Sequence, residues 1–194
     1  VAMRRGNLDT RQEFEELLDP HLDRLYGYAL RMAGNHSDAE DLLQESILRA
    51  FRGLGGFERG SNFKAWIFRI VTNTFISSKR KEKRSPSLLD PETSPDPGVE
   101  DRDEYDLAPT EWEDVYSEVV EDEVKSALDE LPEEFRMPLL LSALGDLRYK
   151  EIAETLKVPI GTVMSRLFRA RQRLRGALRP YAIAHGVPAA RLAG

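Results

Sequence analysis

The sequence of 194 residues contains no cysteine, which excludes disulfide bonds, thiolate metal ligands and cysteine nucleophiles. Its three histidines, His21, His36 and His185, lack metal-ligand spacing. His36 and Glu40 lie four residues apart, but the sequence has no second histidine–carboxylate pair with which they could form a two-metal site. The sequence also lacks a Walker-type loop, a G-x-S-x-G motif and a triad-like set of residues. We therefore expect no enzymatic activity, no cofactor and no bound metal.

Long hydrophobic runs are also missing. The longest apolar stretch, near Met137–Leu144, is far too short to span a bilayer. The first residues, VAMRRGNLDTRQ, do not contain the apolar segment of a secretory signal. Hydrophobic residues make up 41% of the sequence and charged residues 32%, which is typical of a soluble helical protein. We expect the protein to be cytoplasmic.

The formal net charge of −6 hides an uneven distribution along the chain. Residues 1–85 carry 15 basic and 12 acidic groups, residues 86–130 carry 2 and 17, and residues 131–194 carry 11 and 5. Five of the 11 prolines lie within residues 86–113, which show little periodicity. These residues are predicted to form an acidic linker between two helical domains. The acidic average therefore does not argue against binding to nucleic acid.

Residues 148–180 predict two helices, and the second of them has two opposed faces. One face is apolar: Val163, Leu167, Ala170, Leu174 and Leu178. The other is polar and basic: Thr162, Ser165, Arg166, Arg169 and Arg173, flanked by Arg171, Arg175 and Arg179. Arginine can bond guanine or a phosphate, and serine and threonine can bond bases or backbone. The second helix therefore suits the major groove of DNA.

The link between these two helices predicts a helix-turn-helix. Pro159 disfavours the α conformation at Val158, and the next helix can begin at Gly161. The small Ala153 allows two helices to cross closely, and the second helix of such a motif reads the groove. Lys157 would need a left-handed backbone there, which costs about 1 kcal/mol or more. An ordinary basic amphipathic helix in a bundle is the alternative.

Three further helices are predicted in the N-terminal part of the chain. Helical periodicity over residues 14–33 ends at a stop signal, Gly34-Asn35, and Asn35 or Ser37 can cap the second helix. A glycine-rich loop around Phe57 follows, and the third helix covers Asn62–Lys81.

The third helix has a polar face beside an aromatic side chain. Arg69, Asn73, Ser77 and Arg80 share this face, and Trp66 adjoins them. Bases stack on aromatic rings while arginine and lysine hold phosphates, so the pattern suits single-stranded nucleic acid. The alternative is that the aromatic residues of this helix form a core.

Two segments of the chain resemble extracytoplasmic-function (ECF) sigma factors of the sigma-70 family. They read DAEDLLQESILRAFRGLGGFERGSNFKAWIFRIVTNTFISSKRK and LPEEFRMPLLLSALGDLRYKEIAETLKVPIGTVMSRLFRARQRLR. The resemblance covers roughly residues 10–180, with both segments in the family's order. It implies an all-α fold and a factor that binds core RNA polymerase and directs promoter-specific initiation in stress responses.

The resemblance also implies roles for individual residues. Asp41, Gln44 and Glu45 match the helix that docks on the clamp helices of the polymerase β′ subunit, although the helix dipole alone would favour acidic residues there. Phe57 matches the loop that pockets a flipped −10 base, and Asn73 matches a contact to the −10 non-template strand. The −35-reading helix is matched by Met164, Ser165, Arg166, Phe168 and Arg169. Met164 stands where relatives place arginine.

The predicted organisation is a sigma-2-like domain over residues 8–85, a linker over residues 86–113 and a sigma-4-like domain over residues 114–180. The expected partners are core polymerase, through the β′ clamp helices and the β flap, promoter DNA and an anti-sigma factor, without membrane contact. Two other classes stay open. A helix-turn-helix regulator would act without core polymerase, and a helical adaptor would bind protein but no DNA.

Overall fold

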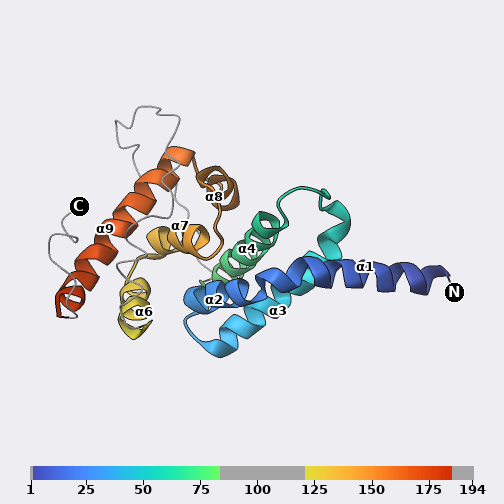
Figure 1. Ribbon diagram of the computed structural model, residues 1–194, viewed down its shortest axis with the longest axis horizontal. Coiled ribbons are helices and arrows are strands. Elements are labelled where there is room, and N and C mark those ends of the chain that lie inside the picture. The colour runs from blue at the N-terminus through green and yellow to red at the C-terminus, as the bar shows by residue number, and fades with distance from the viewer. Residues whose placement is uncertain (1, 84–120, 185–194) are drawn as a thin grey trace.

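The structure is a computed structural model that describes residues 2–83 and 121–184. The predicted linker, residues 86–113, lies outside the described residues. The described parts of the chain are helical and contain no strand, so the predicted all-α fold class is confirmed (Figure 1). None of the described helices is long and apolar enough to cross a membrane.

The N-terminal unit comprises α1 (Ala2–Leu18), α2 (Leu22–Ala33), α3 (His36–Gly53) and α4 (Phe63–Lys83). A short 3-10 helix, Asp19–His21, separates α1 from α2, so the prediction of one periodic helix over residues 14–33 was wrong. Pro20 explains the break, because proline has no N–H to donate inside a helix. The stop signal at Gly34 is confirmed by its left-handed φ of 87°.

The start of α3 is fixed by Asn35, one of the two predicted caps. The Asn35 side chain accepts a hydrogen bond of 2.9 Å from the backbone N–H of Asp38. This bond satisfies one of the donors that a helix start leaves unpaired. Helix α3 then packs between α2 and α4, with Ala39, Leu42 and Ala50 buried.

The C-terminal unit comprises α6 (Glu121–Asp129), α7 (Glu133–Ala143), α8 (Tyr149–Leu156) and α9 (Ile160–Ala184). Helix α9 packs on α6, α7 and α8. It runs through Pro180 and continues past the segment predicted for the two helices, residues 148–180. Leu178 and Ala182 are buried on either side of that proline, so packing outweighs the local cost of its missing N–H.

The two units share one hydrophobic core in this arrangement. Helix α4 lies beside α8, and α2 contacts α6 and α7 (Figure 1). Phe68 on α4 and Tyr28 on α2 are completely buried, and burial raises the pKa of the Tyr28 hydroxyl. The Tyr28 hydroxyl forms a 2.9 Å hydrogen bond with the hydroxyl of Thr72, which in turn donates to the carbonyl of Phe68.

Candidate nucleic-acid interface

The turn before α9 has the geometry of a helix-turn-helix. Lys157 takes the predicted left-handed conformation, with φ of 57°, and the N–H of Val158 donates to the carbonyl of Ala153 at 3.1 Å. The carbonyl of Pro159 accepts from the N–H groups of Thr162 and Val163 and so starts α9. The turn thus ends α8 and begins α9 within four residues, 157–160.

The apolar stripe of α9 is buried as predicted: Val163, Leu167, Ala170, Leu174 and Leu178. Two adjacent residues show the contrast between the faces of α9: Leu167 is 1% exposed and Phe168 is 61% exposed. Arg169 is exposed beside Phe168, while Thr162, Met164 and Ser165 are partly exposed. A large apolar ring held in solvent next to arginine can contact a thymine methyl group and a neighbouring base or phosphate.

Three arginines of α9 make contacts within the C-terminal unit. Arg166 lies 3.6 Å from a carboxylate oxygen of Glu134 on α7, and only 17% of its side chain is exposed. The Arg173 guanidinium lies 4.7 Å from the centre of the Phe135 ring. Arg171 donates to the Tyr149 hydroxyl at 3.4 Å. These contacts orient the arginines, and their assignment to DNA stays a prediction.

The N-terminal unit gathers aromatic rings at the start of α4. Phe57 lies 5.1 Å from Trp66 and 5.4 Å from Phe63, measured between ring centres. Phe57 and Trp66 are each partly exposed, whereas Phe63 is buried. The cluster therefore combines both sequence interpretations: Phe63 is core, and the other two rings retain surface on which a base can stack.

A bidentate ion pair that the sequence did not reveal ties the glycine-rich loop to α1. Arg59 donates two hydrogen bonds of 2.7 Å to the Glu13 carboxylate, which lowers the pKa of Glu13. Gly60 follows with a left-handed φ of 88°, a conformation that favours glycine. The loop that carries Phe57 is thus held against α1 by Arg59, two residues after Phe57.

The polar face predicted on α4 is only partly open. Asn73 and Arg80 are exposed, and Ser77 donates to the carbonyl of Asn73 at 2.7 Å. Arg69, in contrast, lies 3.0 Å from Glu154 on α8. The structure therefore brings Phe57, Trp66 and Arg69 to one end of α4 and leaves Asn73, Ser77 and Arg80 further along it.

The predicted polymerase-binding residues lie on the outer face of α3. Asp41, Gln44 and Glu45 are exposed, and Glu45 pairs with Arg49 at 2.5 Å. Leu48 is 55% exposed and was missed in the sequence. Its position four residues after Gln44 places it on the same face and could have indicated it. In the described residues, His, Asp and Glu form no cluster of three or more that could hold a metal ion.

Comparisons with known proteins match both units. Residues 17–85 match the family described as Sigma-70 region 2, and residues 121–174 match Sigma-70, region 4. The chain is 37% identical over 174 residues to the ECF RNA polymerase sigma factor SigE of Mycolicibacterium smegmatis. That alignment covers 88% of this chain but only 63% of the mycobacterial protein. The chain is 32% identical to the ECF RNA polymerase sigma factor SigW of Bacillus subtilis. That alignment covers 91% of this chain and 93% of SigW.

Two solved structures share the fold. RpoE of Bartonella quintana in complex with the anti-sigma factor NepR matches with a TM-score of 0.65 and 27% identity, over 87% of this chain and 98% of RpoE. CnrH, in complex with the cytosolic domain of CnrY, matches at 20% identity with a TM-score of 0.59, which shows the fold alone. The two matched sigma-70 regions and the full-length likeness to SigW show that the chain belongs to the ECF RNA polymerase sigma factors, which direct transcription to promoters.

Proposed function

We propose that this chain forms a holoenzyme with bacterial core RNA polymerase in the cytoplasm and divides promoter recognition between its two units. Helix α9 reads the −35 duplex, and the loop around Phe57 together with α4 captures the −10 strand. The chain supplies recognition and performs no chemistry itself. The observation that carries the proposal is the contrast on α9, where the apolar stripe is buried and Phe168 and Arg169 face solvent.

For the −10 unit, the proposed contacts are stacking and phosphate binding. Unstacking a base costs a few kcal/mol, which stacking on Phe57 or Trp66 can offset at about 1–3 kcal/mol per base. Asn73 is exposed on the same helix and supplies a hydrogen-bonding amide. Arg69, Ser77 and Arg80 extend the polar face along the strand.

The outer face of α3 is the proposed polymerase-docking surface. Leu48 supplies an exposed apolar side chain among Asp41, Gln44 and Glu45. An apolar anchor inside a polar rim is the usual anatomy of a protein interface. We expect Leu48→Ala to weaken binding to core polymerase, and Glu15→Ala, on α1, to leave it unchanged. An anti-sigma factor, such as the NepR bound to RpoE of Bartonella quintana, would compete for such surfaces.

The experiment is initiation by the purified chain and core polymerase on a pool of duplexes with randomised promoter sequence. Transcripts should start at a subset of the pool that core polymerase alone ignores. Asn73→Ala should reduce open-complex formation, and the loss should shrink on templates with a pre-melted bubble if strand separation is the defect. Tight, selective DNA binding by the chain alone, without initiation, would instead support a regulator that acts independently of polymerase.

A further inference from the structure

The loop that carries Phe57 has little conformational preference of its own. It connects α3, which ends at Gly53, to α4, which begins at Phe63. Four of the eight residues from 53 to 60 are glycine, and glycine loses more conformational freedom than any other residue when it is ordered. The shape of the loop must therefore be set by its contacts.

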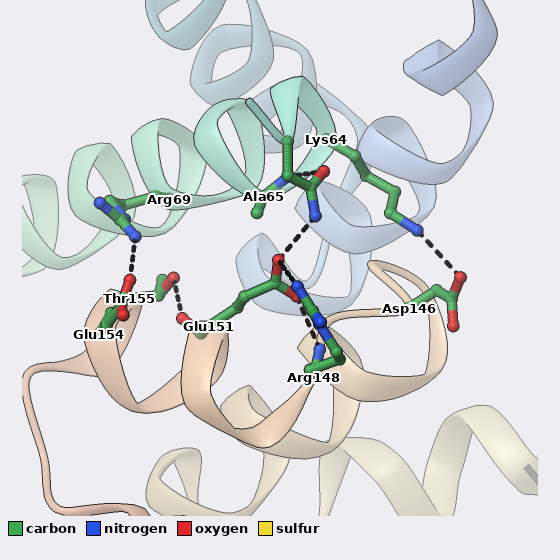
Figure 2. Close-up of polar contacts among 9 residues, drawn as sticks. Lys64, Ala65, Arg69, Asp146, Arg148, Glu151, Glu154 and Thr155 are labelled. Atoms are coloured by element: carbon green, nitrogen blue, oxygen red, sulfur yellow. Dashed lines mark hydrogen bonds and ion pairs between the residues drawn. The ribbon is translucent and has the colours of Figure 1, made fainter. Parts of the chain in front are cut away.

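Local hydrogen bonds fix the two ends of this loop. At its start, the Phe57 N–H donates to the carbonyl of Leu54 at 3.0 Å. At its end, the Asn62 side chain accepts a 3.1 Å hydrogen bond from the Ala65 N–H and so caps α4 (Figure 2). The residues between these two ends need an anchor of a different kind.

The middle of the loop is a tight turn that is anchored to α1. The Ser61 N–H donates to the carbonyl of Glu58 at 3.0 Å, and Gly60 supplies a positive φ at the third position of the turn. Arg59 occupies the second position, and its Nε and Nη2 atoms donate 2.7 Å hydrogen bonds to the two carboxylate oxygens of Glu13. A bidentate pair of this kind fixes orientation as well as distance. The pair therefore fixes the turn relative to α1.

Glu13 lies on a part of α1 that is packed against the core. The next residue, Phe14, is buried, and its ring centre lies 5.5 Å from that of Phe51 and 6.2 Å from that of Phe63. The hydrogen bonds from Arg59 lower the pKa of Glu13, so the carboxylate is charged at neutral pH. The turn is thus held by a charged group on a well-packed helix.

The anchored turn also restricts the Phe57 ring. Phe57 lies two residues before Arg59, and its ring centre lies 5.4 Å from that of Phe63, edge-on, and 5.1 Å from that of Trp66. Part of Phe57 stays exposed. A base that stacks there binds more tightly to a ring already in place, because ordering the loop during capture would cost binding free energy.

A second ion pair on α1 provides a matched comparison. Arg59 and Glu13 are exposed by 76% and 37% of their side chains, and Arg11 and Glu15 by 71% and 52%. Exposed pairs of this kind contribute little to stability, because water and salt weaken them. The two pairs differ in what they connect: the pair of Arg11 and Glu15 lies within α1, whereas the pair of Arg59 and Glu13 joins α1 to the loop.

We propose that Glu13 and Arg59 are positioning residues for base capture. Glu13 holds the turn at Arg59, and the turn holds Phe57 in the orientation that receives a base of the −10 strand. The inference rests on the proposed role of Phe57 and adds two residues that act through it. Direct binding of a phosphate by Arg59 would give the opposite sign at Glu13, because removal of a competing carboxylate would then strengthen binding.

Base capture is measured with the holoenzyme and single-stranded oligonucleotides that carry the −10 sequence selected from the randomised pool. An abasic site is placed at each position in turn, and the captured position is the one where it weakens wild-type binding most. The capture ratio is the affinity for the intact strand divided by the affinity for the strand that is abasic at this position. Phe57→Ala should reduce the capture ratio towards one.

We expect Glu13→Ala and Arg59→Ala each to reduce the capture ratio by about three-fold or more and to leave binding of the abasic strand unchanged. Exchange of the two charges, Glu13→Arg with Arg59→Glu, should restore most of the ratio. Glu13→Ala should have no further effect in a chain that already carries Phe57→Ala. Glu15→Ala is the control and should leave the ratio unchanged.

A wild-type capture ratio in Glu13→Ala, with a reduced ratio in Phe57→Ala, would overturn the positioning role alone. Equal losses on intact and abasic strands would assign the pair a general structural role and would also overturn it. Stronger binding of both strands by Glu13→Ala would replace it with direct phosphate binding by Arg59. An unchanged ratio in Phe57→Ala would instead contradict the proposed function of Phe57, and the positioning role with it.

Discussion

Helices α9 and α4 are both proposed to bind DNA, but they differ in how much of their surface is exposed to solvent. Helix α9 buries one stripe and holds Phe168 and Arg169 in solvent. Helix α4 is buried on several sides, by α2, α3 and α8, and its Arg69 already has an anionic partner. The duplex-facing side of α9 is thus exposed at Phe168 and Arg169, although Arg166 of the same helix lies against Glu134, whereas α4 has other helices packed on several of its sides.

The largest expected effect separates the two faces of α9. Leu167→Ala should lower the free energy of unfolding by about 2–5 kcal/mol, because a completely buried side chain is removed. Phe168→Ala should change it by no more than about 0.5 kcal/mol, because the ring is exposed. Urea denaturation measures both. Phe168→Ala should nevertheless reduce initiation, and equal stability losses in the two variants would contradict the assignment of faces.

The next effect concerns which arginines of α9 read bases. Arg169→Ala should cost about 1–3 kcal/mol of discrimination between matched and mismatched −35 sequences. Arg175→Ala should weaken all sequences alike and reduce the salt dependence by about one unit of slope. Holoenzyme binding to matched and mismatched duplexes at several salt concentrations compares them. Identical behaviour of the two variants would remove the distinction between readers and phosphate contacts.

The turn before α9 contains a residue with a strained backbone, Lys157. Relieving this strain should change the stability of the protein by a smaller amount. Lys157→Gly should raise the free energy of unfolding by about 1 kcal/mol, because glycine takes the left-handed conformation without a Cβ clash. Thermal denaturation would show a higher midpoint. A lower midpoint would mean that the Lys157 side chain contributes more than its backbone strain costs.

The smallest effect is a pH dependence in the N-terminal unit. Burial, followed by the charges of Lys64 and Arg24, lowers the pKa of His21 below its usual 6.5. The unfolded chain therefore binds a proton more readily, so stability is complete above pH 6.5 and is lost as pH falls towards the folded pKa. His21→Gln should flatten this loss in urea denaturation at pH 7.5 and 5.5. Burial raises the pKa of Glu151, but its hydrogen bonds lower it overall, and this shift acts separately, at more acidic pH.

The sequence predicted α9 better than α4 for a physical reason. An amphipathic helix on a surface has one stripe, and all five residues predicted for the stripe of α9 are buried. Helix α4 has neighbours on several sides, so its pattern does not separate core from surface, and the mixed role of its aromatic cluster could not be read from spacing. Helix caps and turns were readable at Asn35 and Lys157 because they are local.

The contacts that the sequence did not reveal join residues far apart in the chain. Arg59 pairs with Glu13, which lies 46 positions away in the sequence, and Arg69 pairs with Glu154, which lies 85 positions away. Single charged residues on exposed helix faces do not identify their partners, because any opposite charge would serve. Pro20 was different, since its position inside an apolar repeat was a visible signal of the break between α1 and α2.

The division of recognition between α9 and α4 is tested most directly by sequencing the transcribed members of a randomised promoter pool. Wild type with core polymerase should enrich two separate sequence blocks. Arg169→Ala should reduce the enrichment of the upstream block alone, and Asn73→Ala should reduce the enrichment of the downstream block alone. Enrichment of a single block, or loss of both blocks in either variant, would contradict the account.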